Sequence, residues 1–158
     1  MPITDILQKN ADFYTNDVSL VEINTKLENQ ARMTWREYAL IEANPSESYR
    51  KEITWSDFNK KANRFANLLL SRGIKKGDKV MLILNRHYQF WFSLIALHKL
   101  GAVAIPATYL LQEHDLEYRF NAAEVSAIVC TSDGDTAHQV DLATEKAPSV
   151  KTKIIVGE

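Results

Sequence analysis

Residues 73–107 constrain the fold more than any other part of the chain. A glycine turn leads into the apolar run Val80–Leu84, and an aromatic-rich stretch from Tyr88 to Leu100 then has the length of a helix. A second apolar run, Ala102–Ile105, follows directly after Gly101. Both short runs are apolar throughout, whereas a strand with one face in water alternates apolar and polar residues. This pattern is typical of strands buried on both faces, so it predicts a strand–helix–strand unit in a parallel sheet covered by helices.

The segments around this unit repeat the same order. A helix is expected from Ser56, which can cap it, to Gly73, whose left-handed conformation would end it. Its apolar face consists of Phe58, Ala62, Phe65, Ala66, Leu69 and Leu70. Further along, the pattern predicts helices over 113–123 and 133–146 and strands over 126–130 and 153–156. We therefore expect an α/β fold, an open and mainly parallel sheet with helices on both faces.

The first third of the chain has a different pattern. Residues 4–15 read as a short helix with Thr4 as its cap, and residues 16–31 are too poorly patterned to assign. Extended runs over 34–42 and 49–55, with turn residues at 44–48 between them, predict a hairpin. The expected organisation is an amino-terminal helix and hairpin region over 1–52, followed by an α/β region over 53–158.

Composition and charge exclude several classes of function. The 158 residues carry 19 basic and 20 acidic side chains, a net charge of −1, which gives no electrostatic reason to expect a nucleic-acid partner. One cysteine cannot form an internal disulfide and suits a reducing compartment. The start of the chain lacks an export signal, and its longest apolar stretch is too short to span a membrane. We expect a cytoplasmic protein.

The residues that could perform chemistry have simpler structural interpretations. The histidines at 87, 98, 114 and 138 have no ligand-type partner at helical spacing, and the side chains of His114 and Asp115 are expected to diverge, so no metal site is predicted.

Cys130 ends a buried strand and reads as a core residue. The loop 131–136 stands where a phosphate loop would lie, but it has two carboxylates and no lysine, so Ser132 or Asp133 is expected to cap a helix. Neither GxGxxG nor GxxxxGK[ST] is present.

Two further features allow alternative interpretations. Arg86 follows the carboxyl end of a central strand, where open α/β sheets bind ligands, so it is a weak candidate for holding a phosphate or carboxylate of a cofactor. The same residue could simply pair with a nearby acid. The apolar helix that begins near Phe90 could line an acyl pocket, but a core helix buried on both sides is the simpler interpretation.

Three motifs, in order, resemble the acyl-adenylate-forming enzymes, the AMP-forming acyl-CoA synthetases. Ile53–Phe58 is similar to the first core motif of that family, and Ala62–Leu69 followed by Gly73 and Gly77–Val80 is similar to its next conserved run. Leu97–Pro106 resembles the second core motif. The sequence of residues 86–108 is most similar to that of acetyl-CoA and medium-chain acyl-CoA synthetases. Asn85 and His98 depart from the residues common there.

The resemblance implies a parent enzyme that converts ATP, a carboxylic acid and CoA to acyl-CoA, AMP and pyrophosphate with Mg²⁺. The family's lysine-ended loop, adenine segment, ribose-binding acid and catalytic lysine are all absent from these residues. No catalytic residue is therefore predicted, and the chain is expected to be an inactive amino-terminal fragment, truncated from a longer protein whose remainder is its partner. Its missing neighbours predict an exposed apolar patch that could drive self-association. The alternative is a stand-alone, non-catalytic binding or scaffold module derived from the family.

Overall fold

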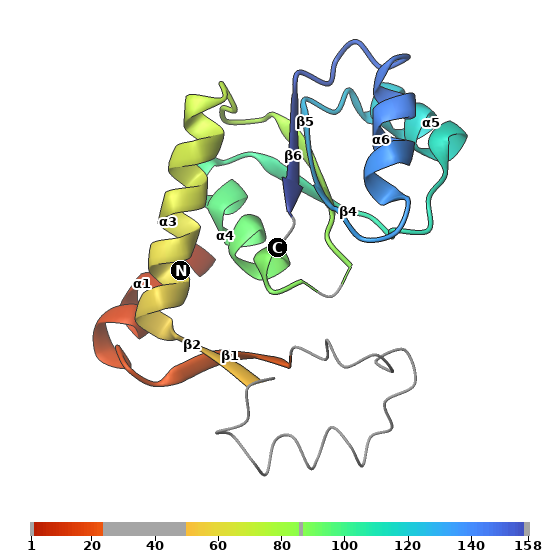
Figure 1. Cartoon of the computed structure of the whole chain (residues 1–158). Helices are drawn as coiled ribbons and strands as arrows, with labels where there is room; N and C mark the ends of the chain where they lie inside the picture. The colour runs from red at the N-terminus through yellow and green to blue at the C-terminus, as the bar shows by residue number, and fades with distance from the viewer. Residues whose placement is uncertain (1, 24–49, 86, 157–158) are drawn as a thin grey trace. The chain divides into compact units, whose positions relative to one another are not determined.

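The computed structural model of the chain describes residues 2–23, 50–85 and 87–156 (Figure 1). Two compact units are present: Asp5–Asn59, and Lys60–Glu158 together with Pro2–Thr4. The division into regions 1–52 and 53–158 stays a prediction. Among the described residues, no helix combines the length and the apolar character that crossing a membrane requires.

The first unit contains a helix and a two-stranded antiparallel sheet. Helix α1 spans Ile3–Phe13, and strand β1 (Val18–Ile23) pairs with strand β2 (Arg50–Thr54). The Ser19 hydroxyl donates a hydrogen bond to the Ile53 carbonyl, 2.8 Å away, which ties the two strands together at one end. The helix expected over 4–15 and the extended run over 49–55 are confirmed. Strand β1 lies in the segment left unassigned, whereas the expected strand 34–42 and turn 44–48 lie outside the described residues.

The starts of the first two long helices differ from expectation. Helix α3 spans Trp55–Ser71, and the Thr54 hydroxyl accepts a hydrogen bond from the backbone N–H of Asp57 at 3.1 Å. The prediction that Ser56 caps this helix was therefore wrong, because the helix begins before it. Likewise Thr4 lies inside α1 rather than ahead of it. Both shifts are of one or two residues, the usual uncertainty of a helix start.

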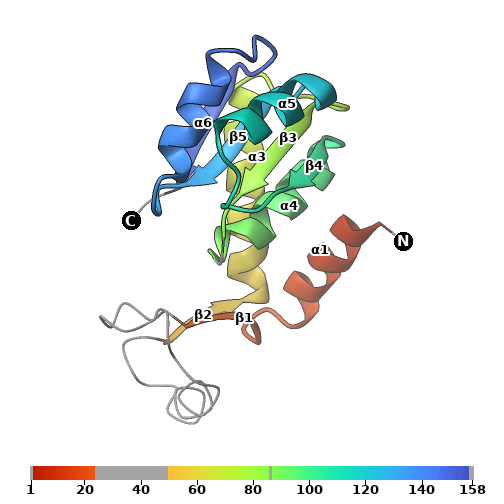
Figure 2. The same ribbon diagram turned by 90° about the vertical axis from the view of Figure 1, so that its right-hand side faces the viewer.

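The second unit is built on a four-stranded parallel sheet in the order β4-β3-β5-β6. Its strands are β3 (Lys79–Ile83), β4 (Val103–Pro106), β5 (Ala127–Thr131) and β6 (Thr152–Val156). Helices α4 (Gln89–Leu100), α5 (Glu113–Ala123) and α6 (Thr136–Thr144) connect them in turn. Figure 2 shows β4, β3 and β5 side by side. The predicted open parallel α/β fold is confirmed.

The central strands are buried on both faces, as their apolar sequences predicted. Val80 and Leu82 of β3 belong to a core cluster with Leu69 of α3 and Leu97 of α4. Their neighbours Met81 and Ile83 point the other way, into a second cluster with residues of α5 and α6. Helices therefore cover both faces of the sheet (Figure 1). Successive side chains of one strand serve opposite cores because they alternate across the sheet.

The aromatic helix α4 is only partly enclosed. Its face with Ala96 and Leu97 is fully buried between the sheet and α3, and Phe92 contacts Phe65 of α3 edge to face. Trp91, however, is 52% exposed. Helix α4 was interpreted as a core helix buried on both sides. This is correct for the faces that contact the sheet and α3, but it is wrong for the surface that carries Trp91.

Candidate ligand-binding edge

The carboxyl ends of β3 and β5 meet at the point where the chain changes its winding direction. From β3 the chain passes through α4 to β4 on one side, and from β5 it passes through α6 to β6 on the other side. The two strands are direct neighbours. The loops that follow them therefore diverge, and open α/β sheets usually bind ligands in the crevice between such loops.

A histidine from one loop and two residues from the other meet across this point. Nε2 of His87, which follows β3, lies 2.8 Å from Oδ2 of Asp133 and 2.9 Å from the hydroxyl of Thr131. Thr131 is fully buried at the end of β5, and its hydroxyl also accepts the backbone N–H of Asp133 at 3.0 Å. Asn85 turns the chain out of β3 with a left-handed φ of 43°. These contacts fix the two loops to each other.

The partners of His87 select one form of its ring. A carboxylate only accepts hydrogen bonds, so Nε2 carries the proton that faces Asp133 and Thr131. In the neutral ring, Nδ1 then holds a lone pair. Nδ1 of His87 could therefore accept a proton or a hydrogen bond. The contacts of Nε2 with Asp133 and Thr131 already join the two loops.

This arrangement makes a spectroscopic prediction. In proton–nitrogen correlation spectra at neutral pH, His87 should show the tautomer protonated at Nε2. Replacing Asp133 with alanine should reduce the population of that tautomer and lower the free energy of unfolding by at most about 1 kcal/mol, because the pair is partly exposed. His138 is an exposed control that should not change. A dominant Nδ1-protonated form of His87 in the unaltered chain would contradict the assignment.

The contact between His87 and Asp133 also shows that the predicted cap of the last helix was wrong. Neither Ser132 nor Asp133 caps α6, which begins at Thr136 rather than at residue 133. Asp133 faces His87 instead, and Gly134 adopts a left-handed φ of 57° in the turn. The side chain of Asp135 accepts a hydrogen bond from Gln139, 2.7 Å away, within the first turn.

The other sequence candidates are scattered. Arg86 lies outside the described residues. His98 and His138 are exposed on separate helices. Nε2 of His114 lies 3.4 Å from Oδ1 of Asp115, so the expectation that the side chains of His114 and Asp115 diverge was wrong. The described parts of the chain hold no group of three histidine, cysteine or acidic side chains able to bind a metal ion.

Cys130 is buried in the second core cluster. Burial, together with the negative charge of Asp141, raises the pKa of its thiol from the ordinary value near 9 to about 11, and Lys153 offsets this only in part. The thiol is therefore protonated at neutral pH and is not a nucleophile. Its position agrees with the interpretation as a core residue.

Cys130 gives a second prediction. At pH 8 the native chain should react with iodoacetamide at least about a hundredfold more slowly than the chain in urea, because the thiolate is scarce and buried. Because the pKa is raised, the thiol's contribution to stability is complete below pH 9 and is lost as the pH rises towards 11. Cys130→Ala should remove this part of the pH dependence. Rapid labelling of the native chain would contradict the buried placement.

Sequence reasoning missed the pairing of His87 with Asp133. The two residues are 46 positions apart, and neither belongs to a local motif. The only signal available was that each follows an apolar strand, and that signal becomes informative once β3 and β5 are known to be neighbours.

Comparisons with known proteins give a consistent result. A family described as AMP-binding enzyme matches residues 27–158. The mitochondrial acyl-coenzyme A synthetase ACSM5 of Rattus norvegicus is 34% identical over 110 residues, and that of Homo sapiens is 36% identical over 110 residues. Each match covers 68% of this chain and 19% of the relative. The chain thus spans about a fifth of the length of these relatives.

Solved structures share the fold. A fatty acyl CoA synthetase of Mycobacterium tuberculosis matches 98% of this chain and 26% of its own, with a TM-score of 0.75 and 19% identity. The anthranilate CoA ligase AuaEII, solved in complex with anthranoyl-AMP, matches 100% of this chain and 25% of its own, also with a TM-score of 0.75 and 19% identity. At this identity the likeness concerns the fold alone.

Proposed function

The chain belongs to the AMP-binding enzyme family, and from that membership we propose that it forms the amino-terminal part of an AMP-forming acyl-CoA synthetase. The observation that carries the proposal is the similarity over 110 residues to proteins named acyl-coenzyme A synthetases. The three motifs between Ile53 and Pro106 support it, because they occur in order on α3, β3, α4 and β4.

The proposed parent reaction has two steps. A carboxylate oxygen of a small carboxylic acid attacks the α-phosphorus of ATP, so that an acyl-adenylate forms and pyrophosphate leaves. The thiolate of CoA then attacks the acyl carbon and releases AMP. ATP, Mg²⁺ and CoA belong to this reaction of the whole protein.

The described residues at the switch point do not fit the phosphates of ATP. Asp133 places a carboxylate at this edge, and Asp135 adds a second negative charge at the start of α6. The Nε2 proton of His87 is already donated to Asp133 and Thr131. Because like charges repel, this edge disfavours a polyphosphate. We therefore assign no catalytic, metal-binding or nucleotide-binding role to the described residues of this edge.

The role that remains for the chain is structural support. Two buried clusters hold the sheet between α3 and α4 on one face and α5 and α6 on the other. Such a layered unit can serve as a rigid base against which the rest of a large domain packs. The remainder of the parent protein is thus the proposed partner.

The test is to read the DNA beyond the codon for Glu158. A frame that continues into a Ser/Thr/Gly-rich loop ending in lysine supports the synthetase. A stop codon directly after Glu158 would contradict it and favour the stand-alone scaffold module.

The cytoplasmic location expected from the sequence is also a proposal. The mammalian relatives are named as mitochondrial proteins, so cell fractionation of the natural protein is the appropriate check.

A further inference from the structure

Asp133 is the only aspartate or asparagine of the chain that is followed by a glycine. In such a pair the backbone nitrogen of the glycine can attack the side-chain carbon Cγ of the aspartate, because the glycine has no side chain to block the approach. The pair lies in the turn between β5 and α6, where residues 132–135 are all exposed to solvent. Both the sequence and the place in the fold therefore make Asp133–Gly134 a candidate for a reaction of the backbone itself.

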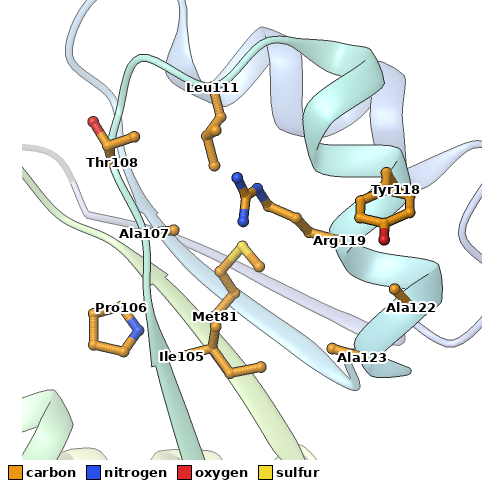
Figure 3. A pocket seen from close by; sticks show the side chains of 10 residues that line it. All are labelled: Met81, Ile105, Pro106, Ala107, Thr108, Leu111, Tyr118, Arg119, Ala122 and Ala123. Carbon is orange, nitrogen blue, oxygen red and sulfur yellow. The ribbon is translucent and has the colours of Figure 1, made fainter.

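This turn is separate from a cavity of about 440 Å³ that lies beside α5. Residues of β3, β4 and α5 and of the loop between β4 and α5 line that cavity, as Figure 3 shows, and neither Asp133 nor Gly134 is among them. The reaction of an Asp–Gly pair needs no bound ligand, since its reactants are two neighbouring residues and water. The turn has to provide access to solvent rather than a pocket.

The attacking nitrogen is accessible. Within the described residues, the backbone N–H of Gly134 donates no hydrogen bond. A Cβ placed on Gly134 would meet no described atom within 4 Å, so the space around the residue is open. Asp115 differs in this respect, because the N–H of the following Leu116 donates to the Gln112 carbonyl at 3.0 Å and Leu116 is buried. The nitrogen after Asp133 can therefore react, whereas the nitrogen after Asp115 is held in a helix.

The other reactant, Asp133, is held by two contacts. Its Oδ2 lies 2.8 Å from Nε2 of His87, and its backbone N–H donates to the hydroxyl of Thr131 at 3.0 Å. The side chain of Asp133 is 55% exposed, so its contact with His87 can open without disturbing the core. Ring closure requires Cγ to leave His87 and to approach the nitrogen of Gly134. The closed contact and the reaction therefore exclude each other.

We propose that Asp133–Gly134 is a site of isoaspartate formation and that the hydrogen bond from His87 restrains this reaction. The nitrogen of Gly134 forms a bond to Cγ of Asp133, and the bond from Cγ to one carboxylate oxygen breaks. That oxygen leaves as water after it takes up the proton of the attacking N–H and one proton from solvent. Water then opens the succinimide ring at the main-chain carbonyl, and one proton returns to the solvent. The proposal goes beyond the synthetase function, because it concerns a change of the chain itself.

The product cannot restore the original contact. In isoaspartate the backbone runs through Cβ and Cγ, and the carboxylate is attached directly to Cα. The carboxylate is thus displaced from Nε2 of His87, for which the hydroxyl of Thr131 remains as a partner. Isoaspartate formation therefore converts a reversible opening of the contact between His87 and Asp133 into a permanent one.

The experiment incubates the 158-residue chain at neutral pH for several weeks. Isoaspartate is measured with protein isoaspartyl methyltransferase and labelled S-adenosylmethionine, and peptide mapping locates the modified residue. Isoaspartate should accumulate at Asp133 and not at Asp115, which is the internal control in the same sample. The population of the His87 tautomer protonated at Nε2 should fall in step. His87→Ala should accelerate the reaction about fivefold, because the loss of a partly exposed contact of about 1 kcal/mol raises the open population by that factor.

Two variants at position 133 separate the chemistry from the contact. Asp133→Asn forms the same ring with ammonia as a better leaving group, so it should give isoaspartate faster than the unaltered chain. Asp133→Glu keeps a carboxylate but would need a larger ring, so it should give none. Absence of isoaspartate at residue 133 in the unaltered chain would overturn the proposal, and its absence in D133N as well would show that the turn prevents ring closure. A folded H87A variant that reacts no faster than the unaltered chain would overturn the restraining role of His87.

Discussion

Replacing Phe120 with alanine is expected to lower the free energy of unfolding by about 3–5 kcal/mol, the cost of deleting a fully buried aromatic side chain. Phe120 on α5 is 0% exposed and packs in the second core cluster with Met81, Leu116 and Ile128. Its loss would leave a cavity between α5 and the sheet. Domains of this size have about 5–15 kcal/mol of stability, so the change removes a large part of it. Urea unfolding followed by circular dichroism measures the effect.

Tyr118 provides the control on the same helix. It lies two residues earlier and is 73% exposed, so Tyr118→Ala should change the free energy of unfolding by no more than about 0.5 kcal/mol. The pair of variants tests whether α5 buries the face assigned to it. Equal effects of the two substitutions would mean that the helix is rotated or not packed on the sheet.

The second large effect concerns catalysis. If the proposed structural role is right, the isolated chain should release no pyrophosphate from ATP with any short- or medium-chain acid. The full product of its reading frame should convert the same acids, ATP and CoA to acyl-CoA and AMP. Pyrophosphate release and acyl-CoA formation can be followed in parallel for the two proteins, with a reaction lacking the acid as the control.

The two outcomes of this comparison are independent. Activity of the isolated chain would show that nucleotide chemistry resides in these residues and would refute the structural role. An inactive full product would leave the fold unchanged but would remove the synthetase proposal.

The sequence predicted the parallel sheet because its signals are local. Val80–Leu84 is apolar at every position, and the strand alternates between two cores as such a run requires. Gly73 ends its helix with φ 84°, as its residue type favours. Each of these features depends on residues adjacent in the chain.

The features that the sequence did not predict depend on distant pairing. Strand β1 is recognisable only with its partner β2, about thirty residues later, because two short strands stabilise each other through their ladder. The contact of His87 with Asp133 required the strand order, which places β5 rather than β4 on that side of β3. Helix α6 begins at Thr136 rather than at the predicted residue 133, because Asp133 contacts His87 instead of capping the helix.

Helix α5 combines a feature that the local sequence predicts with contacts that it does not predict. Its bounds, Glu113–Ala123, coincide with those predicted from local pattern. The partners of its acidic side chains were not predictable: Glu113 and Glu117 contact Lys146, and Asp115 contacts Gln112 and His114. Lys146 follows the end of α6, Gln112 immediately precedes α5, and His114 lies in the first turn of α5 itself.

Titration of ATP and of a non-hydrolysable acyl-adenylate analogue into the isolated chain, followed by calorimetry, tests the structural role most directly. The account predicts no measurable heat of binding for either ligand at any concentration that keeps the chain folded. Stoichiometric, saturable binding of either ligand would contradict it.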